Sequence, residues 1–231
     1  MLKRRNGNPN SEGCNRPVNR YVDPNPQRDK AVTTFGVIRH AETVWNREKR
    51  IQGHQDSPLT TEGEMMADRW GMALRAFHWD RILASDIGRA VATAGRINIR
   101  LQVPMEVDPR LRELDWGRWT TKTVAQLRQE EGEMLAVQER AGWDFQPPQG
   151  ESRRSQLARC PQALLEAAGR HPGDSILVVT HRGVIKCLAH GLSDSGPLAA
   201  DKIGAQLYRL YWVAAAAGRL SLDGLNALVL S

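Results

Sequence analysis

The chain has 231 residues, of which 41% are hydrophobic and 25% are charged, with a formal net charge of +6. This length accommodates one sizeable domain or two small ones, and the composition is ordinary for a soluble globular protein. A membrane span is not expected because no run of about eighteen apolar residues occurs. The three cysteines, Cys14, Cys160 and Cys187, are scattered, so they offer neither a disulfide framework nor CxxC metal spacing and fit a reducing cytosol.

Most of the positive charge lies near the N-terminus. Residues 1–30 hold seven Lys/Arg and three Asp/Glu, so this segment carries +4 of the net charge and residues 31–231 carry +2. The body of the chain is therefore not basic enough to indicate nucleic acid as a partner. Residues 1–30 are rich in Asn, Pro and Arg without a periodic apolar pattern, which predicts a disordered extension ahead of one catalytic domain at 31–231. No apolar stretch follows the first basic residues, so we expect no secretory signal and a cytoplasmic protein.

From residue 34 onward, short apolar runs alternate with segments whose apolar residues recur at helical spacing. The predicted strands are TFGVIRH (34–40), RILAS (81–85), VPMEV (103–107) and SILVVTH (175–181), with a terminal β pair from LYRLYWV (207–213) and GRLSL (218–222). The predicted helices are 60–77, 86–98, 120–141, 152–169 and 184–192. We expect Thr60 or Thr61 to cap the first helix, Ser152 to cap the fourth, and Pro161 to kink or restart the fourth.

Strands that alternate with helices predict an α/β fold, a three-layer α/β/α sandwich with a mostly parallel central sheet. In such sheets, ligands bind at the carboxyl ends of the strands. Arg39-His40 follow the first predicted strand, Ser85-Asp86 the second, and His181-Arg182 the strand at 175–181. We therefore expect these polar side chains to share one cleft.

The residues at these strand ends are suited to phosphoryl transfer. The transferred group spreads negative charge over three oxygens, and the planar guanidinium of arginine contacts two oxygens at once. A histidine with an unprotonated ring nitrogen can attack phosphorus, and a carboxyl group can protonate the departing oxygen. The chain has two histidines at strand ends, arginines beside them, and a carboxylate, Glu113, in LRELDWG (111–117). This set is sufficient for the chemistry without a metal cluster or another cofactor.

Five blocks of sequence resemble the histidine phosphatase superfamily, in its phosphoglycerate mutase-like branch. They follow the order typical of that family: RHAETVWNREKRIQGHQDSPLTTEG (39–63), ASDIGRAVATA (84–94), LRELDWGRW (111–119), PPQGES (147–152) and VVTHRGV (178–184). The resemblance covers about residues 34–190. It implies the fold predicted above and an enzyme that carries phosphate on a histidine.

Carried over position by position, the resemblance implies a role for five catalytic residues. His40 would be the nucleophile that becomes phosphohistidine. Arg39 and Arg89 would clamp the phosphate oxygens, and His181 would donate a further hydrogen bond in the transition state. Glu113 would be the general acid toward the leaving oxygen and then the base for water.

The resemblance also implies binding residues, and the chain departs from the family at two positions. Asn46 would contact the phosphate, while Gln52 and Gly53 would lie near the outer part of the substrate. Ala41 replaces the glycine common after the nucleophile, a change that adds one methyl group. Arg182 stands where the family more often has a small residue, and it could point into the cleft toward an acidic substrate or face solvent.

Three functions are compatible with this resemblance. The first is a metal-independent phosphatase acting on a small phosphorylated metabolite. The second is a mutase that returns the phosphate to another hydroxyl, but such enzymes generally have a longer segment between the acid and the second histidine. Glu113 and His181 are only 68 positions apart, which favours hydrolysis. The third, an inactive module that binds phosphorylated ligands, is disfavoured because the catalytic residues are all present. We expect no nucleic-acid or membrane partner, and no oligomeric state follows from the sequence.

Residues 114–160 are expected to form the lid of the pocket. This segment contains Trp116, Trp119, Trp143 and Phe145, which indicate some apolar surface around the substrate. Within the family, phosphosugars, phosphoglycerates and a cobalamin-pathway nucleotide phosphate are the candidate substrates.

Overall fold

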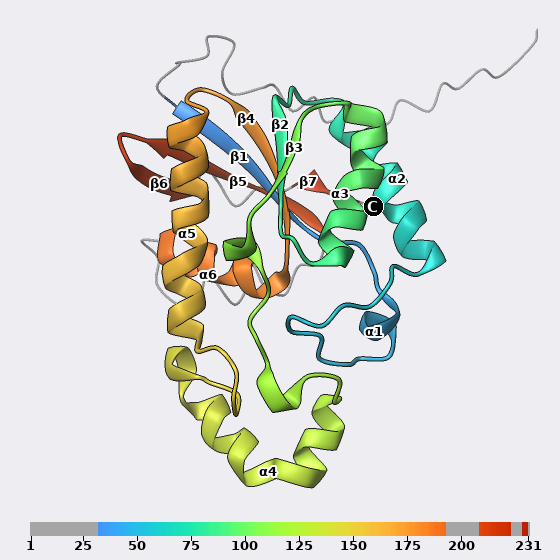
Figure 1. Cartoon of the computed structure of the whole chain (residues 1–231), viewed down its shortest axis with the longest axis vertical. Coiled ribbons are helices and arrows are strands. Elements are labelled where there is room, and N and C mark those ends of the chain that lie inside the picture. Colours follow the sequence, from blue (N-terminus) through green and yellow to red (C-terminus); the bar gives the residue numbers. More distant parts are fainter. Residues whose placement is uncertain (1–31, 193–207, 223–227, 231) are drawn as a thin grey trace, which may run out of the picture.

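The structure is a computed structural model that describes residues 32–192, 208–222 and 228–230. One sheet with helices on both of its faces makes up most of the described chain (Figure 1). The predicted N-terminal extension, residues 1–30, lies outside the described residues.

Seven strands of the described chain form this sheet, in the order β3-β2-β4-β1-β5-β6, with β7 paired to β5. They are β1 (Val32–Arg39), β2 (Arg81–Ala84), β3 (Met105–Val107), β4 (Ser175–Thr180), β5 (Arg209–Ala216), β6 (Arg219–Leu222) and β7 (Leu228–Val229). The four strands from β3 to β1 run parallel, whereas β5 is antiparallel to β1 and to its other neighbours. The sheet is thus mostly parallel, which confirms the predicted fold class.

Side chains alternate between the two faces of the sheet and build a separate core on each. Along β4, Ile176 and Val178 belong to one apolar cluster, and Leu177 and Val179 belong to the other. The first cluster also contains residues of α5 and α6, and the second contains residues of α2 and α3. This period of two is what a strand covered on both faces requires, and Figure 1 shows the two helix pairs on opposite sides of the sheet.

The helices are α1 (Val44–Arg47), α2 (Thr61–Leu74), α3 (Gly88–Leu101), α4 (Val124–Arg140), α5 (Arg153–Arg170) and α6 (Arg182–Leu192), with short 3₁₀ turns η1 (Pro109–Leu111), η2 (Gly117–Trp119) and η3 (Gly142–Asp144). Two predicted caps are confirmed: the Thr60 hydroxyl accepts from Gly63 N–H, and the Ser152 hydroxyl accepts from Ser155 N–H. Helix α5 does not restart at Pro161, because its buried face packs on the sheet on both sides of the proline.

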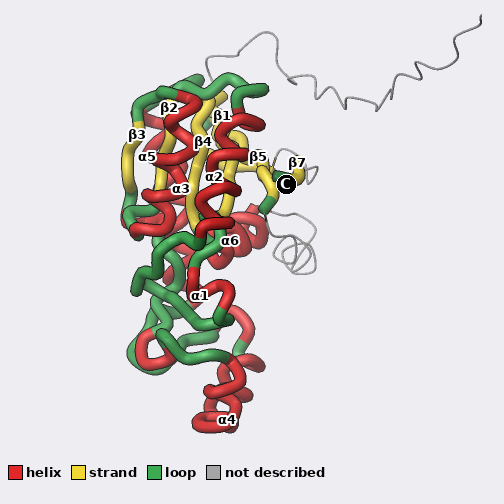
Figure 2. The backbone as a smooth tube through the Cα atoms, turned by 90° about the vertical axis from the view of Figure 1, so that its right-hand side faces the viewer, coloured by secondary structure: helices red, strands yellow, loops and turns green. Residues whose placement is uncertain are grey.

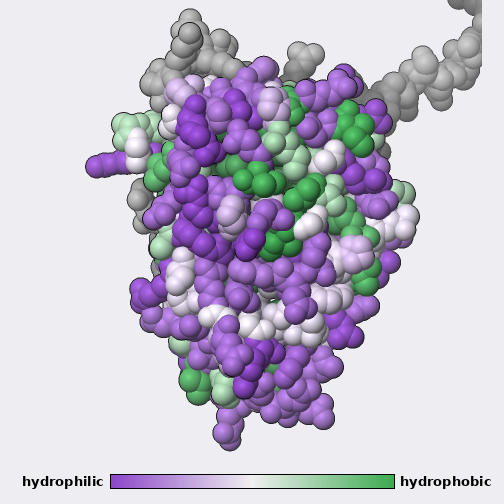
Figure 3. Space-filling view, in the orientation of Figure 1, coloured by the Kyte–Doolittle hydropathy of each residue, from purple (hydrophilic) through white to green (hydrophobic). Residues whose placement is uncertain are grey.

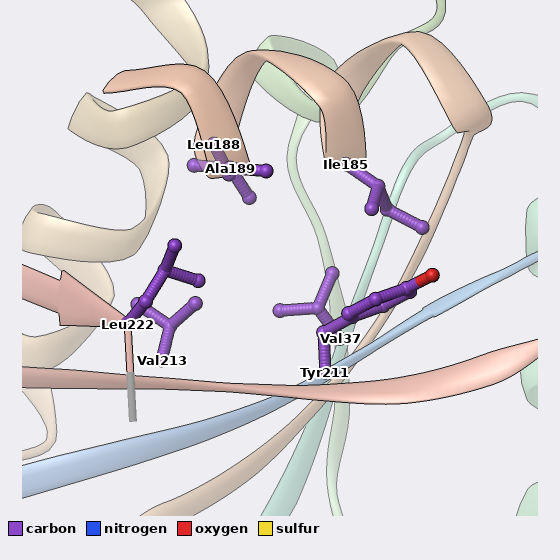
Figure 4. A pocket seen from close by; sticks show the side chains of 7 residues that line it. All are labelled: Val37, Ile185, Leu188, Ala189, Tyr211, Val213 and Leu222. Carbon is purple, nitrogen blue, oxygen red and sulfur yellow. The ribbon is translucent and has the colours of Figure 1, made fainter. Parts of the chain in front are cut away.

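Packing between α6 and the sheet is close. The one void described there measures about 10 Å³, roughly the space of a single water-sized probe. Figure 4 shows apolar side chains of α6 facing those of the strands across this void. A void of this size is too small for a substrate, so α6 and the strands pack directly against each other here.

Helix α4 lies beyond the end of the sheet, away from the two main cores, in both Figure 1 and Figure 2. A third apolar cluster supports it, made by Leu114, Trp119, Leu127, Leu135 and Phe145. Figure 3 shows the lower end of the molecule, where α4 lies, to be mainly hydrophilic on the visible face. The predicted lid segment therefore forms a lobe with its own small core.

Besides the three 3₁₀ turns, two described elements were not predicted from the sequence, α1 and β7, and both are short. Helix α1 depends on a capping box in which the side chains of Thr43 and Asn46 bond each other's backbone N–H. Within the described ranges, none of the helices combines the length and the apolar character that crossing a bilayer requires.

Candidate active site

The two predicted active-site histidines lie side by side at the carboxyl ends of β1 and β4. These strands are parallel neighbours, and the His40 N–H donates to the Thr180 carbonyl at 2.8 Å, which continues their pairing one residue past β1. The centroids of the His40 and His181 rings are 5.3 Å apart. The side chains are buried, with exposed fractions of 3% and 0%, so a charge on either ring is costly.

His40 is held as a neutral ring with one nitrogen available for attack. Its Nδ1 lies 2.7 Å from the carbonyl oxygen of Ala41, and since a carbonyl only accepts, Nδ1 carries the proton. Burial, followed by the charges of Arg39 and Arg89, lowers the pKa of His40 well below its ordinary value. The Nε2 atom of the neutral ring therefore carries a lone pair at neutral pH.

His181 is oriented by Ser85, which follows β2. The Nε2 atom of His181 lies 2.9 Å from the Ser85 hydroxyl oxygen, which also accepts from the Ile87 N–H at 3.3 Å. If the hydroxyl donates its one proton to Nε2, the ring proton of His181 lies on Nδ1. Burial, followed by the charges of Arg89 and His40, lowers the pKa of His181 well below its ordinary value. Within the described chain, Nδ1 is buried and has no hydrogen-bond partner.

Arg89 is fixed by carbonyl groups of the loop before α2. Its Nη1 donates to the carbonyl of Gln55 at 2.7 Å and its Nη2 to that of Gly53 at 2.8 Å. The side chain of Asp56 accepts from the backbone N–H of Arg89 at 3.0 Å and so caps the start of α3. The Arg89 side chain is 1% exposed, and its Nε has no hydrogen-bond partner among the described residues. Burial is the main cause of its lowered pKa, which the charges of Glu113 and Asp56 partly offset.

Arg39 supplies the second cation of the cluster from the last position of β1. Its Nε is likewise buried without a hydrogen-bond partner in the part of the chain that the structure describes. Burial lowers its pKa, and the nearby Glu113 charge opposes that effect. An arginine stays protonated under all ordinary conditions, so the site holds the positive charges of the buried Arg89 and the partly buried Arg39 beside the histidines.

Glu113 lies at the edge of this cluster in a fixed orientation. One carboxylate oxygen accepts from Leu114 N–H at 2.8 Å and from the Gln156 side chain at 3.2 Å, and the other accepts from Gly183 N–H at 3.1 Å. A Cβ atom on Gly183 would lie 2.0 Å from that carboxylate, so the close approach depends on glycine. The acid is thereby held against the start of α6, one turn from His181.

The predicted binding residues differ in what they contact. The Asn46 side-chain oxygen accepts from Thr43 N–H at 3.2 Å and closes the capping box of α1. The buried Gln52 donates to the Thr43 hydroxyl at 2.8 Å, and Gly53, at φ +54°, supports Arg89 through its carbonyl. In the described structure, Asn46 thus contacts the start of α1, and Gly53 contacts Arg89.

The sequence left open whether Arg182 points into the cleft or faces solvent, and the structure shows its position. It is the first residue of α6, its side chain is exposed, and it lines a cavity of about 620 Å³ together with Glu113. The residue therefore both faces solvent and borders the site.

Two residues of the site were not predicted from the sequence: Asp56 and Gln156. Ser85 was expected in the cleft from its strand-end position and lies there beside His181, but nothing near it in the sequence specified a histidine partner. Asp56 and Gln156 act on catalytic residues 33 and 43 positions away, and no local pattern signals such contacts.

Among the described residues, no group of three or more His, Cys, Asp or Glu side chains is placed to hold a metal ion. The concentrated charge of the site is that of its arginines.

The site thus joins two buried histidines, two arginines and one carboxylate at the strand ends of an α/β sheet. The family model of the histidine phosphatase superfamily (branch 1) matches residues 35–228. The chain belongs to this superfamily.

Relatives of this chain include both mutase-named and phosphatase-named proteins. It is 37% identical over 152 residues to a protein named "Probable phosphoglycerate mutase GpmB" of Enterobacter sp. (strain 638), with 66% of this chain and 71% of that protein covered. Among solved structures, YhfR of Bacillus stearothermophilus has 31% identity and a TM-score of 0.75, with 86% of this chain and 98% of that chain covered. A mycobacterial glucosyl-3-phosphoglycerate phosphatase has 29% identity and a TM-score of 0.70, with 85% and 100% covered.

Proposed function

We propose that this protein is a metal-independent phosphomonoesterase that hydrolyses a small phosphorylated metabolite through a phosphohistidine intermediate. One observation carries the proposal: Arg39 Nε, Arg89 Nε and His181 Nδ1 are all buried nitrogen atoms with no hydrogen-bond partner among the described residues, and with the ring proton of His181 on Nδ1 all three are donors. Buried donors without partners are rare and costly. The oxygens of a phosphoryl group beside His40 would accept from all three.

The chemistry follows from the protonation states of the side chains. In the first step Nε2 of His40 attacks phosphorus, and the bond from phosphorus to the ester oxygen breaks while Glu113 gives that oxygen a proton. In the second step Glu113 takes a proton from water, whose oxygen attacks phosphorus. The phosphorus–nitrogen bond breaks, its electron pair returns to Nε2, and inorganic phosphate leaves. The two arginines offset the charge on the equatorial oxygens throughout, the role that a metal ion fills in other phosphatases.

Mutase activity is the second candidate, supported by the name of the Enterobacter relative. The mycobacterial phosphatase supports hydrolysis of a phosphorylated metabolite. We favour hydrolysis because only 68 positions separate Glu113 from His181, a short segment for a mutase of this family. A cytoplasmic location is part of the proposal, supported by the buried free thiols of Cys160 and Cys187.

The test is trapping of the intermediate. Mixing the protein with nitrophenyl phosphate in the presence of a chelator should release inorganic phosphate, and rapid quenching should show one phosphoryl group on His40 by peptide mass. His40→Ala should abolish both signals while the circular dichroism spectrum stays unchanged. Turnover by the folded His40→Ala variant would end the proposal. With a phosphoglycerate as the substrate, formation of its isomer without release of inorganic phosphate would favour the mutase.

A further inference from the structure

A cavity of about 620 Å³ borders the catalytic cluster at Glu113. Its walls come from the first turns of α5 and α6, from the end of α4 and η3, and from residues 113–116. A general acid must touch the oxygen that it protonates, so the rest of the leaving alcohol extends away from Glu113. The cavity therefore lies where the alcohol portion of a substrate has to go, under the function proposed above.

The cavity is larger than a small alcohol would fill. One water occupies about 30 Å³ of liquid, so the space corresponds to roughly twenty waters. The volume falls within the range of about 300–1,000 Å³ that is typical of sites for drug-sized ligands. A three-carbon alcohol would leave much of this space filled by solvent, whereas an alcohol built on a ring would fill it.

Two tryptophans present apolar surface to this cavity. Trp116 packs edge-on against Phe145 with ring centroids 5.3 Å apart, and Trp143 stacks on His190 at 4.0 Å. These contacts restrain both indoles, so their surfaces are preformed for the face of a sugar or aromatic ring. Trp119 and Phe145, also expected at the pocket, are 0% and 2% exposed and form the core behind it.

Positive charge predominates on the same walls. Arg182 and Lys186 are four positions apart on α6 and share one helix face, and Arg153 begins α5. Besides Glu113, Glu139 is the acidic residue among the described lining residues. The pKa of Arg39 is lowered mainly by burial, and the charge of Arg182 contributes to the same shift, so the like charges lie near one another. An anionic group in the cavity would reduce this repulsion.

We propose that the alcohol portion of the substrate carries both a ring and an anionic group. The ring packs against Trp116 and Trp143, and the anionic group pairs with the cations of α5 and α6. This inference rests on the proposed function and narrows its substrate class to phosphate monoesters of ring-bearing acids.

The experiment compares matched esters hydrolysed by the full chain. Benzyl phosphate and 4-carboxybenzyl phosphate both release a benzylic alcohol, and the two alcohols differ by one remote charge. A 4-phosphonobenzyl ester tests the other common anion. We expect kcat/KM to be roughly 10- to 100-fold higher for an anionic ester, the worth of hydrogen bonds to a charged group. Higher values for either anion support the inference.

Variants identify the groups responsible. Arg153→Gln, Arg182→Gln and Lys186→Gln should each lower the ratio of kcat/KM between the anionic and neutral esters, because each removes one cation from the wall. Arg69→Gln, which removes an exposed cation on α2, is the matched control and should keep the ratio. Trp143→Ala should lower kcat/KM for benzyl phosphate more than for ethyl phosphate.

Two negative outcomes are distinguishable. If nitrophenyl phosphate is hydrolysed but both anionic esters have the same kcat/KM as benzyl phosphate, the substrate class is wrong and the phosphatase assignment stands. If no ester, nitrophenyl phosphate included, is hydrolysed, the proposed function fails and this inference fails with it.

Discussion

The Nε2 atom of His181 and the hydroxyl oxygen of Ser85 lie 2.9 Å apart, although the residues are 96 positions apart in the chain. The contact joins the ends of two adjacent parallel strands, β2 and β4. A hydroxyl that donates to Nε2 would leave the ring proton on Nδ1, the atom with no partner in the described chain. We propose that Ser85 is a positioning residue that selects this tautomer of His181.

Ser85→Ala should reduce kcat/KM on nitrophenyl phosphate by up to about tenfold, the worth of one hydrogen bond. A purely structural role would lower activity in any background. We expect instead that Ser85→Ala causes almost no further loss when His181 is already alanine, because the two side chains act as a unit. Equal losses in both backgrounds, measured in a double-mutant cycle, would show that Ser85 does not act through His181.

Glu113→Gln and Arg89→Ala should respond differently to the leaving group. An alkyl oxygen leaves poorly without a proton, so Glu113→Gln should lose about 10²- to 10⁴-fold on an alkyl phosphate and far less on nitrophenyl phosphate. Arg89 contacts oxygens common to all substrates under the proposed mechanism, so its loss should be similar for both esters. The measurement is a two-by-two comparison of kcat/KM. Equal losses for Glu113→Gln would remove the acid assignment, unless a burst shows dephosphorylation to be rate-limiting.

Gly183→Ala should separate activity from stability. The added Cβ would lie 2.0 Å from the Glu113 carboxylate, so the acid must move, whereas alanine suits a helix better than glycine. We expect the thermal midpoint to stay constant or rise while alkyl phosphate hydrolysis falls at least tenfold. Gly169→Ala in α5 is the matched control, since nothing lies within 4 Å of its added Cβ. A loss of stability without a leaving-group effect would contradict the proposed role of Gly183.

Stability should depend on pH through the two buried histidines. Burial is the main cause of the lowered pKa of His40 and of His181. Below the ordinary value of about 6.5 the unfolded chain takes up these protons while the folded protein still excludes them, so the free energy of unfolding falls as pH falls. Each histidine contributes up to about 1.4 kcal/mol per pH unit in that window. Urea unfolding between about pH 7 and 5 should show a shallower slope for the His40→Gln/His181→Gln variant, and parallel slopes would refute the linkage.

The ends of the strands were predictable from the sequence, and so was the meeting of these ends at one edge of the sheet. The apolar runs before His40 and His181 are the two central strands, and parallel strands place such ends together. The caps at Thr60 and Ser152 were also predictable, because a capping side chain accepts from a backbone N–H only three positions further along the chain.

What could not be predicted depends on pairs of residues far apart in the chain. The hydrogen bond from Gln156 to Glu113 and the hydrogen bond from the Arg89 N–H to Asp56 at the start of α3 form only after the helices pack. The four aromatic residues of segment 114–160 looked alike in the sequence. Only the fold separates Trp119 and Phe145, which are buried, from Trp116 and Trp143, which line the cavity.

The cluster of Leu114, Trp119, Leu127, Leu135 and Phe145 shares no member with the two cores that flank the sheet. It supports one wall of the cavity but not the strands that carry His40 and His181. Substitutions that reshape this lobe can therefore accumulate over evolution without loosening the end of the sheet that carries His40 and His181. A change of substrate and a change of chemistry are separable events in this architecture, and directed evolution of new specificity should begin at residues 114–153.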